Sequence, residues 1–246
     1  MKTYYFLLIL SGAVYNVCAA DNTTAELASL KEKMHRAIIK VEQTQKKLWS
    51  YQVSRYENEE GDITSSIEQY SPQSSSPWFL KKINGKSPSK KQITKFVKKM
   101  QEQNYPQQQE NNIQLPLRKL INSESLTLVS SDDEYVVMAF NVYIEKLGKD
   151  AMGKLQGELV YQKDKQFIEE ITVWNNADFS PMFTANITDL ALTFSFVNIG
   201  GAVLAKQSEM KMKGSFAYFT AINETSLDSY SDYLYQGMKK TIKTVE

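Results

Sequence analysis

The feature that most constrains the fold is a succession of short apolar segments separated by short turns. Segments rich in β-branched and aromatic residues fill most of the chain after residue 125, and further ones lie between Trp49 and Ile83. Together they predict about ten strands. Strands joined by so few residues must run antiparallel, because parallel neighbours need long crossovers. A sheet of that width curls, so we expect an α+β fold with a strongly curved antiparallel sheet forming an unclosed barrel.

One long amphipathic helix precedes the strands. Thr23 and Glu26 have the spacing of a capping box. Apolar residues then recur every three or four positions, which predicts a helix over residues 24–48 with one apolar stripe. The stripe should pack on the sheet, and its members are Leu27, Leu30, Met34, Ile38, Val41 and Leu48.

A second helix is predicted as an insertion after Ser87-Pro88-Ser89. Its expected apolar face carries Ile93, Phe96, Val97 and Met100. The opposite face carries five lysines, which either lie in solvent as ordinary helix-surface residues or make transient contact with an anionic membrane surface. These lysines are Lys90, Lys91, Lys95, Lys98 and Lys99.

Residues 1–20 have the organisation of a secretory signal peptide. Lys2 precedes an apolar stretch, and small residues at Cys18 and Ala20 fit a cleavage site after Ala20. We therefore expect a periplasmic or secreted protein with a single domain over residues 21–246. The alternative, a lipoprotein anchored at Cys18, requires a lipobox that Tyr15, Asn16 and Val17 match poorly.

Composition excludes several functional classes for the chain after cleavage. Losing Lys2 reduces the 29 basic residues to 28, equal to the 28 acidic residues. A chain without basic excess is not built to bind nucleic acid. Since Cys18 is the one cysteine, thiol nucleophiles and thiolate metal sites are excluded as well. We expect a monomer without cofactor or metal.

No complete catalytic motif occurs, so we expect a protein that is not an enzyme. His35 is the one histidine, and its place in the first helix favours a surface role over that of a general base. Two Ser-x-x-Lys patterns, Ser87 with Lys90 and Ser208 with Lys211, leave a serine-type hydrolase as a second alternative.

Aromatic and apolar residues on the strand faces suggest a binding function. In a curved sheet too wide to be filled, they would line a cavity for an apolar ligand. If the core is filled instead, the same residues are packing, and the protein is a structural or interaction protein of the cell envelope. The candidate ligand-binding residues are Met138, Phe140, Val142, Phe194, Phe196, Phe216 and Tyr218.

Three stretches carry a resemblance to a known family. They are residues 174–196 (WNNADFSPMFTANITDLALTFSF), 213–217 (KGSFA) and 230–233 (YSDY). They are similar to uncharacterised bacterial secreted proteins that resemble the LolA/LolB lipoprotein-carrier superfamily, as does the order of helix and strands. The resemblance implies an unclosed barrel, helices acting as a lid and a hydrophobic cavity for acyl chains. It implies a non-catalytic periplasmic carrier of a lipid, a lipoprotein acyl chain or another apolar ligand, and it assigns no site residue.

Overall fold

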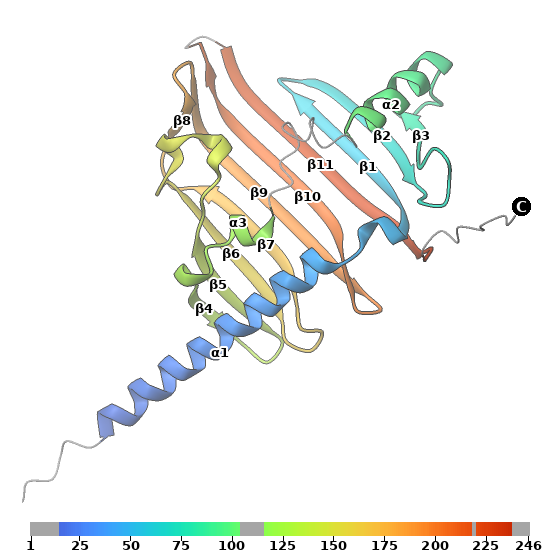
Figure 1. Ribbon diagram of the computed structural model, residues 1–246. Helices are drawn as coiled ribbons and strands as arrows, with labels where there is room; N and C mark the ends of the chain where they lie inside the picture. The colour runs from blue at the N-terminus through green and yellow to red at the C-terminus, as the bar shows by residue number, and fades with distance from the viewer. Residues whose placement is uncertain (1–14, 104–115, 218–219, 238–246) are drawn as a thin grey trace, which may run out of the picture.

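The computed structural model describes residues 15–103, 116–217 and 220–237 (Figure 1). Side chains are described from Thr24 onward within these ranges. The predicted signal peptide lies mostly outside them, and the predicted cleavage point after Ala20 falls within the first helix. Export and cleavage therefore stay predictions.

One antiparallel sheet of 11 strands dominates the molecule and confirms the predicted fold class. The strand order is β3-β2-β1-β11-β10-β9-β7-β6-β5-β4, with β8 paired to β9. β3 and β4 are the two edges, so the curved sheet is not closed (Figure 1). The strands are β1 Trp49–Glu59, β2 Asp62–Tyr70, β3 Trp78–Ile83, β4 Thr127–Ser131, β5 Tyr135–Asn141, β6 Leu155–Gln162, β7 Phe167–Asn175, β8 Phe179–Met182, β9 Ala185–Ile199, β10 Ala202–Phe216 and β11 Thr220–Tyr235.

The last strand differs from the sequence-based prediction. Apolar and aromatic residues predict a short strand over residues 215–222, followed by a Ser/Asp/Tyr-rich segment over residues 226–235. Instead β11 continues to Tyr235, and it pairs with β10 over residues 220–229 and with β1 over residues 224–235. Both backbone edges are paired over residues 224–229, while the side chains of β11 are half-buried or exposed. Because no apolar face is needed there, the usual alternation of apolar and polar residues is missing.

Helix α1 (Tyr15–Gln43) crosses one face of the sheet. The predicted stripe is confirmed: Met34, Ile38 and Val41 are buried, and α1 contacts β7 and β10. The helix ends earlier than predicted, and a 3₁₀ turn, Lys46–Leu48, leads into β1. The Thr44 hydroxyl donates to the Lys40 carbonyl (2.8 Å) and accepts from the Val203 backbone N–H (3.2 Å), which ties the end of α1 to β10.

The helical insertion forms as predicted. Helix α2 (Lys90–Gln103) begins after Ser89, which exchanges hydrogen bonds with Gln92 in a capping box. Phe96 and Met100 are buried against the sheet, but Ile93 of the predicted apolar face is exposed. A short helix, α3 (Leu117–Leu120), lies beside α1. All three helices lie on the same face of the sheet (Figure 1).

The hydrophobic core lies between α1 and one half of the sheet. Met138, Leu159, Ile171 and Val173 are fully inaccessible to solvent, and they form one cluster with the α1 stripe. The core therefore positions α1, and the end of α1 reaches beyond the core toward β10 and β11.

Within the described residues, no helix is both long and apolar enough to cross a lipid bilayer.

Candidate ligand-binding groove

A groove of about 680 Å³ opens between the helices and the face of the sheet that they cover. The end of α1, the turn after it and α3 form one wall, and β9, β10 and β11 form the other. Six of its lining residues are apolar and large: Val41, Leu117, Leu120, Leu192, Phe194 and Phe196. Its volume lies within the roughly 300–1,000 Å³ that small-molecule pockets occupy.

Strand register explains how the groove changes character across the sheet. Phe194 of β9 lies opposite Ile171 of β7 and Ser208 of β10. Ser208 lies opposite Asp228 of β11, which in turn lies opposite Arg55 of β1. Residues directly opposite one another share a face of the sheet. This row therefore runs from a fully buried isoleucine, through a half-buried phenylalanine, to charged groups.

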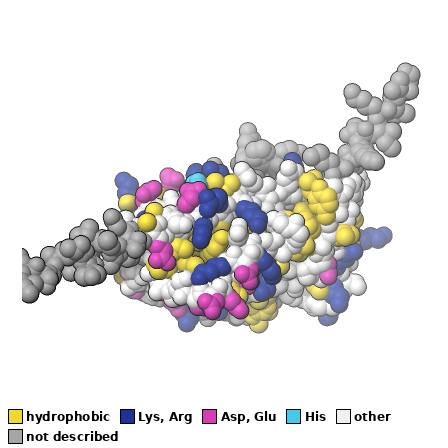
Figure 2. Space-filling model, turned by 90° about the horizontal axis from the view of Figure 1, so that it is seen from below, with side chains coloured by type: hydrophobic (Ala, Val, Ile, Leu, Met, Phe, Trp, Pro, Cys, Tyr) yellow, Lys and Arg dark blue, Asp and Glu magenta, His cyan; other side chains and the backbone are white. Residues whose placement is uncertain are grey.

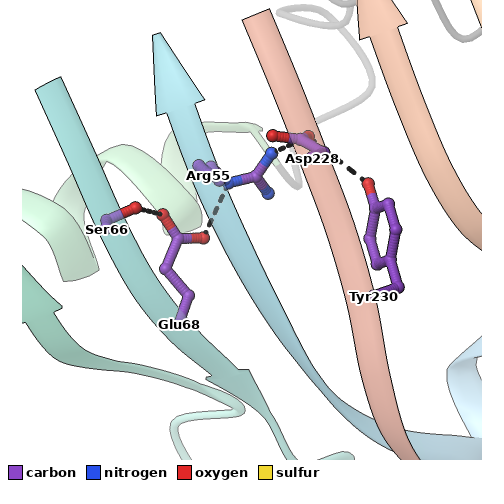
Figure 3. A network of polar contacts seen from close by, with 5 residues as sticks. All are labelled: Arg55, Ser66, Glu68, Asp228 and Tyr230. Atoms are coloured by element: carbon purple, nitrogen blue, oxygen red, sulfur yellow. Dashed lines mark hydrogen bonds and ion pairs between the residues drawn. The ribbon is translucent and has the colours of Figure 1, made fainter. Parts of the chain in front are cut away.

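The charged end of the row is a hydrogen-bonded network drawn from three strands (Figure 3). Arg55 Nε donates to Glu68 Oε2 at 3.0 Å, and Arg55 Nη1 donates to Asp228 Oδ2. Ser66 Oγ donates to Glu68 Oε1 at 2.9 Å, and the Tyr230 hydroxyl approaches Asp228 Oδ2 at 3.4 Å. Glu68 is almost completely buried, so the guanidinium of Arg55 compensates a carboxylate that has lost most of its hydration.

Electrostatics inside the network favour protonated hydroxyls. Burial raises the pKa of Asp228, and the attraction of Arg55 offsets this only in part. Burial and the Asp228 carboxylate raise the pKa of Tyr230 to about 12. Burial would lower the pKa of Arg55, but Glu68 and Asp228 outweigh it and raise that pKa. One guanidinium thus faces two carboxylates, and Tyr230 stays a hydrogen-bond donor at neutral pH.

The network lies between two hollows. Tyr230 lines the 680 Å³ groove, whereas Arg55 and Glu68 line a hollow of about 380 Å³ beneath α2. Lys95 and Lys99 of α2 reach the rim of this second hollow. The network therefore forms a polar partition between the apolar groove and a more polar space.

A cluster of aromatic rings borders the network toward the start of β1. Tyr51 lies 5.9 Å from Tyr230, 5.5 Å from Tyr233 and 5.2 Å from Tyr70 between ring centroids. The Tyr233 hydroxyl donates to the Ala205 carbonyl at 2.7 Å, and Ala205 itself lines the groove. Burial raises the pKa of both Tyr51 and Tyr233, so these hydroxyls also stay neutral.

The opposite wall of the groove carries cations. Lys46 and Lys47 line it from the turn that follows α1. Glu42 lines it too, but its carboxylate accepts from Arg118 Nε at 2.5 Å and from the Arg118 backbone N–H at 3.1 Å. The Glu42 charge is thereby neutralised, and the two lysines leave this wall positive.

A separate basic hollow lies along the middle of α1. It has a volume of about 300 Å³ and is lined by Lys33, Arg36 and Lys40 of α1 together with Lys163 after β6. Lysine and arginine side chains are gathered beside hydrophobic ones when the molecule is seen from below (Figure 2). Glu32 pairs with Arg36 at 3.1 Å, so part of this charge is balanced at the surface.

The structure divides the predicted ligand-binding residues into three groups. Phe194 and Phe196 line the groove. Met138, Phe140 and Val142 are buried core residues outside its lining, and the Phe140 ring packs over Gly157, where an added Cβ would lie 2.4 Å from Phe140 Cζ. Phe216 is at the far end of β10, opposite Ala185, and is 45% exposed. Tyr218 lies outside the described residues.

The polar partners of the groove were not predicted from the sequence. Asp228 lies in a Ser/Tyr-rich segment without the ligand spacing of a calcium loop, and Tyr230 belongs to a stretch that carries the family resemblance without an assigned role. Glu68 lies in a segment that alternates only weakly between apolar and polar residues. Two-residue alternation on β1 could have revealed Arg55, because it places Arg55 on the same face as the buried Val53.

The candidate catalytic residues do not assemble in the described parts of the chain. His35 is exposed on α1, and Ser87 and Lys90 are exposed at the start of α2. Ser208 and Lys211 are three positions apart on β10, so their side chains leave opposite faces of the strand. Among described residues, no group of three or more His, Cys, Asp or Glu side chains could hold a metal ion.

Comparison with known proteins adds one distant likeness. No protein-family model matches the chain, and no curated protein matches it significantly. The fold is similar to the crystal structure of a DUF1329 family protein from Desulfovibrio piger, with a TM-score of 0.34 and 9% identity over 87% of this chain and 95% of that one. A likeness at this level carries no argument about function.

Proposed function

We propose that this protein binds an apolar or amphipathic molecule in the groove between its helices and β9–β11. The observation that carries the proposal is a 680 Å³ groove with Leu192, Phe194 and Phe196 along its floor. Phe194 is only half-buried in the free protein, and so is Leu117 on the facing wall. A ligand that covers both side chains gains about 25 cal/mol per Å² of apolar surface removed from water.

The proposal extends to a carrier role of the LolA/LolB type. The open curved sheet, with helices over one face, is the arrangement that the resemblance implies. A carrier would also need export and access to membranes. The five lysines of α2 are exposed, and Lys98 has one exposed partner, Glu102, at 3.8 Å. An exposed cationic face of this kind suits transient contact with anionic lipid headgroups.

Fluorescence of the neutral apolar probe N-phenyl-1-naphthylamine tests the binding function. We expect saturable binding to the full chain and at least a tenfold weaker affinity in Phe194→Asp, since the new carboxylate would have to be desolvated beside the ligand. Ser208→Phe should block the groove by volume without adding charge. Far-ultraviolet circular dichroism verifies that each variant is folded.

Phe216→Asp is the matched control, because it makes the same chemical change on the same sheet outside the groove. Its affinity for the probe should equal that of the unmodified protein. Absence of saturable binding to the unmodified protein, or equal loss in Phe194→Asp and Phe216→Asp, would overturn the proposal.

One observation favours the envelope interaction protein as a second candidate. Met182 at the end of β8 is 58% exposed, and Phe183 after it is 89% exposed. Met152 is 57% exposed and follows the 3₁₀ turn Lys149–Ala151, which contacts β8. Apolar side chains gathered at one end of a molecule are typical of contact surfaces. Absence of probe binding in the groove would favour this second candidate function.

A further inference from the structure

We infer that the occupant of the groove is a single-chain amphiphile with an anionic head, bound with its head at Lys46 and Lys47 and its chain along β9. The inference rests on the proposed binding function and adds the chemical class and the orientation of the ligand. A free fatty acid is the simplest molecule of this class.

Lys46 and Lys47 both line the groove, and among the described residues neither ammonium group makes an ion pair or hydrogen bond. Glu42 is the acidic residue in the described lining, and Arg118 already holds both of its oxygens. An incoming anion therefore meets two available cations at this wall and no competing carboxylate.

The environment of Lys46 supports the same conclusion. Its side chain keeps an exposed surface, yet the protein around its ammonium lowers its pKa by desolvation. Desolvation without an opposite charge nearby is unfavourable for the protonated form. A carboxylate or other anionic head placed there would offset that cost.

The fixed position of the turn gives the ligand a direction. The Thr44 hydroxyl accepts from the backbone N–H of Val203, and Val203 lies opposite Asn198 at the end of β9. From that end, Phe196, Phe194 and Leu192 follow on one face of β9 at two-residue steps, so the apolar floor extends about 13 Å away from the lysines. An acyl chain with its head at Lys46 would lie along this floor.

The opposite side of the groove disfavours an anion. Beyond Tyr230, the Arg55 guanidinium is shared by Glu68 and Asp228, so the network has more carboxylates than cations. An anionic head placed there would be repelled, while Ser208 and Tyr230 could accommodate uncharged groups. The two sides of the groove thus select the orientation by charge.

The test compares three ligands that share a twelve-carbon chain and differ in the head: dodecanoate, dodecan-1-ol and dodecyltrimethylammonium. Each displaces N-phenyl-1-naphthylamine from the full chain at pH 7.5, below its critical micelle concentration. We expect dodecanoate to bind about tenfold more tightly than the alcohol, as two partly exposed ion pairs allow, and the cation to bind most weakly.

Lys46→Gln/Lys47→Gln should reduce the affinity for dodecanoate to that for the alcohol and leave the affinity for the alcohol unchanged. Lys33→Gln/Lys40→Gln is the matched control, because it removes two positive charges from α1 outside the groove. It should keep the preference for dodecanoate. Equal loss in both double variants would show a general charge effect and overturn the inference.

Failure of the inference can be distinguished from failure of the proposed function. If the three ligands displace the probe equally, the groove binds chains without selecting an anionic head, and only the inference fails. If neither the probe nor any ligand binds the unmodified protein, the binding function itself fails.

Discussion

The two halves of the sheet share the same antiparallel strand pairing but differ in how their side chains pack beneath the helices. On β5, β6, β7 and β9, residues facing α1 are almost all apolar and buried. On β10, β11 and β1–β3, few side chains are buried, and Val53, Val203 and Leu204 are the apolar ones among them. Helices cover both halves (Figure 1). Coverage by a helix therefore does not by itself create a packed core.

The difference follows from which side chains the strands direct toward the helices. In the filled half, Phe140 packs over Gly157 so closely that no space for a methyl group remains. In the open half, the corresponding positions hold Ser208, Asp228 and Arg55, of which Asp228 and Arg55 form an ion pair. Polar groups held in this way fix the backbone but leave space above it, and the groove occupies that space.

The largest contrast is expected when an aspartate is placed in the packed core and in the groove. Ile38→Asp places a carboxylate in the core beneath α1, where Ile38 is 1% exposed, and should lower the free energy of unfolding by about 4 kcal/mol or more. Phe194→Asp, at a half-buried groove position, should lower it by much less. Urea denaturation followed by circular dichroism measures both. Equal losses would mean that the groove is as tightly packed as the core.

The second contrast concerns how the open half is held together. Arg55→Met leaves Glu68, whose side chain is 5% exposed, without its cation, and should cost about 3 kcal/mol. Arg36→Met breaks an exposed pair with Glu32 and should cost less than about 1 kcal/mol. The two costs are compared by the midpoints of urea denaturation, provided that the slope of the unfolding free energy against urea concentration is unchanged. A cost for Arg55→Met no larger than that for Arg36→Met would mean that the network does not stabilise the open half.

The filled half was largely predictable from the sequence. Leu30, Met34 and Ile38 recur at helical spacing, and the hairpin of β6 and β7 follows from two apolar segments around Asp164 and Lys165. Apolar periodicity works there because the structure buries those faces. Apolar periodicity could not show whether Met138 and Phe140 pack in the core or line a cavity, since both roles require the same residue types.

The open half was much less predictable, for the same physical reason. The side chains of β11 are half-buried or exposed, so the strand does not need apolar residues at alternate positions. Residues Ser226–Tyr235 therefore lack the alternation of apolar and polar residues that predicts a strand. The pairing of β1 with β11 joins residues about 180 positions apart, as in Ser50 with Leu234, and no local pattern encodes it. Arg55 and Glu68 meet within the local hairpin of β1 and β2, but Asp228 reaches them through the long-range topology alone.

A third contrast uses small increases in volume. Gly157→Ala puts a methyl group against Phe140 and Val142 and should cost about 1–3 kcal/mol, because a packed core has no room to relax. Ala205→Val adds two methyl groups beside the groove and should cost less than about 1 kcal/mol while weakening probe binding. Thermal unfolding compares the two. A larger loss for Ala205→Val would contradict the distinction between the halves.

The smallest contrast is in pH dependence, where two aspartates should act with opposite signs. Burial raises the folded-state pKa of Asp228 above its ordinary value of 3.8. The folded protein then binds this proton more tightly than the unfolded chain, so the contribution of Asp228 to stability decreases as the pH rises from 3.8 through the raised pKa. Asp228→Asn does not titrate, so its stability relative to the unmodified protein should increase over that window and stay constant above it.

Asp150 accepts from the Ser180 backbone N–H at 2.7 Å and from Lys154 at 3.0 Å, which lowers its pKa below 3.8. Its stabilising contribution is present above 3.8 and is lost as the pH falls through the lowered pKa, so Asp150→Asn should be less stable at pH 7 and equal to the unmodified protein at the acid end. Urea titrations of the three proteins at several pH values between 3 and 7 measure these differences. If both variants change in stability relative to the unmodified protein in the same direction as the pH rises from 3 to 7, burial is not what distinguishes the open half from the exposed turn that carries Asp150.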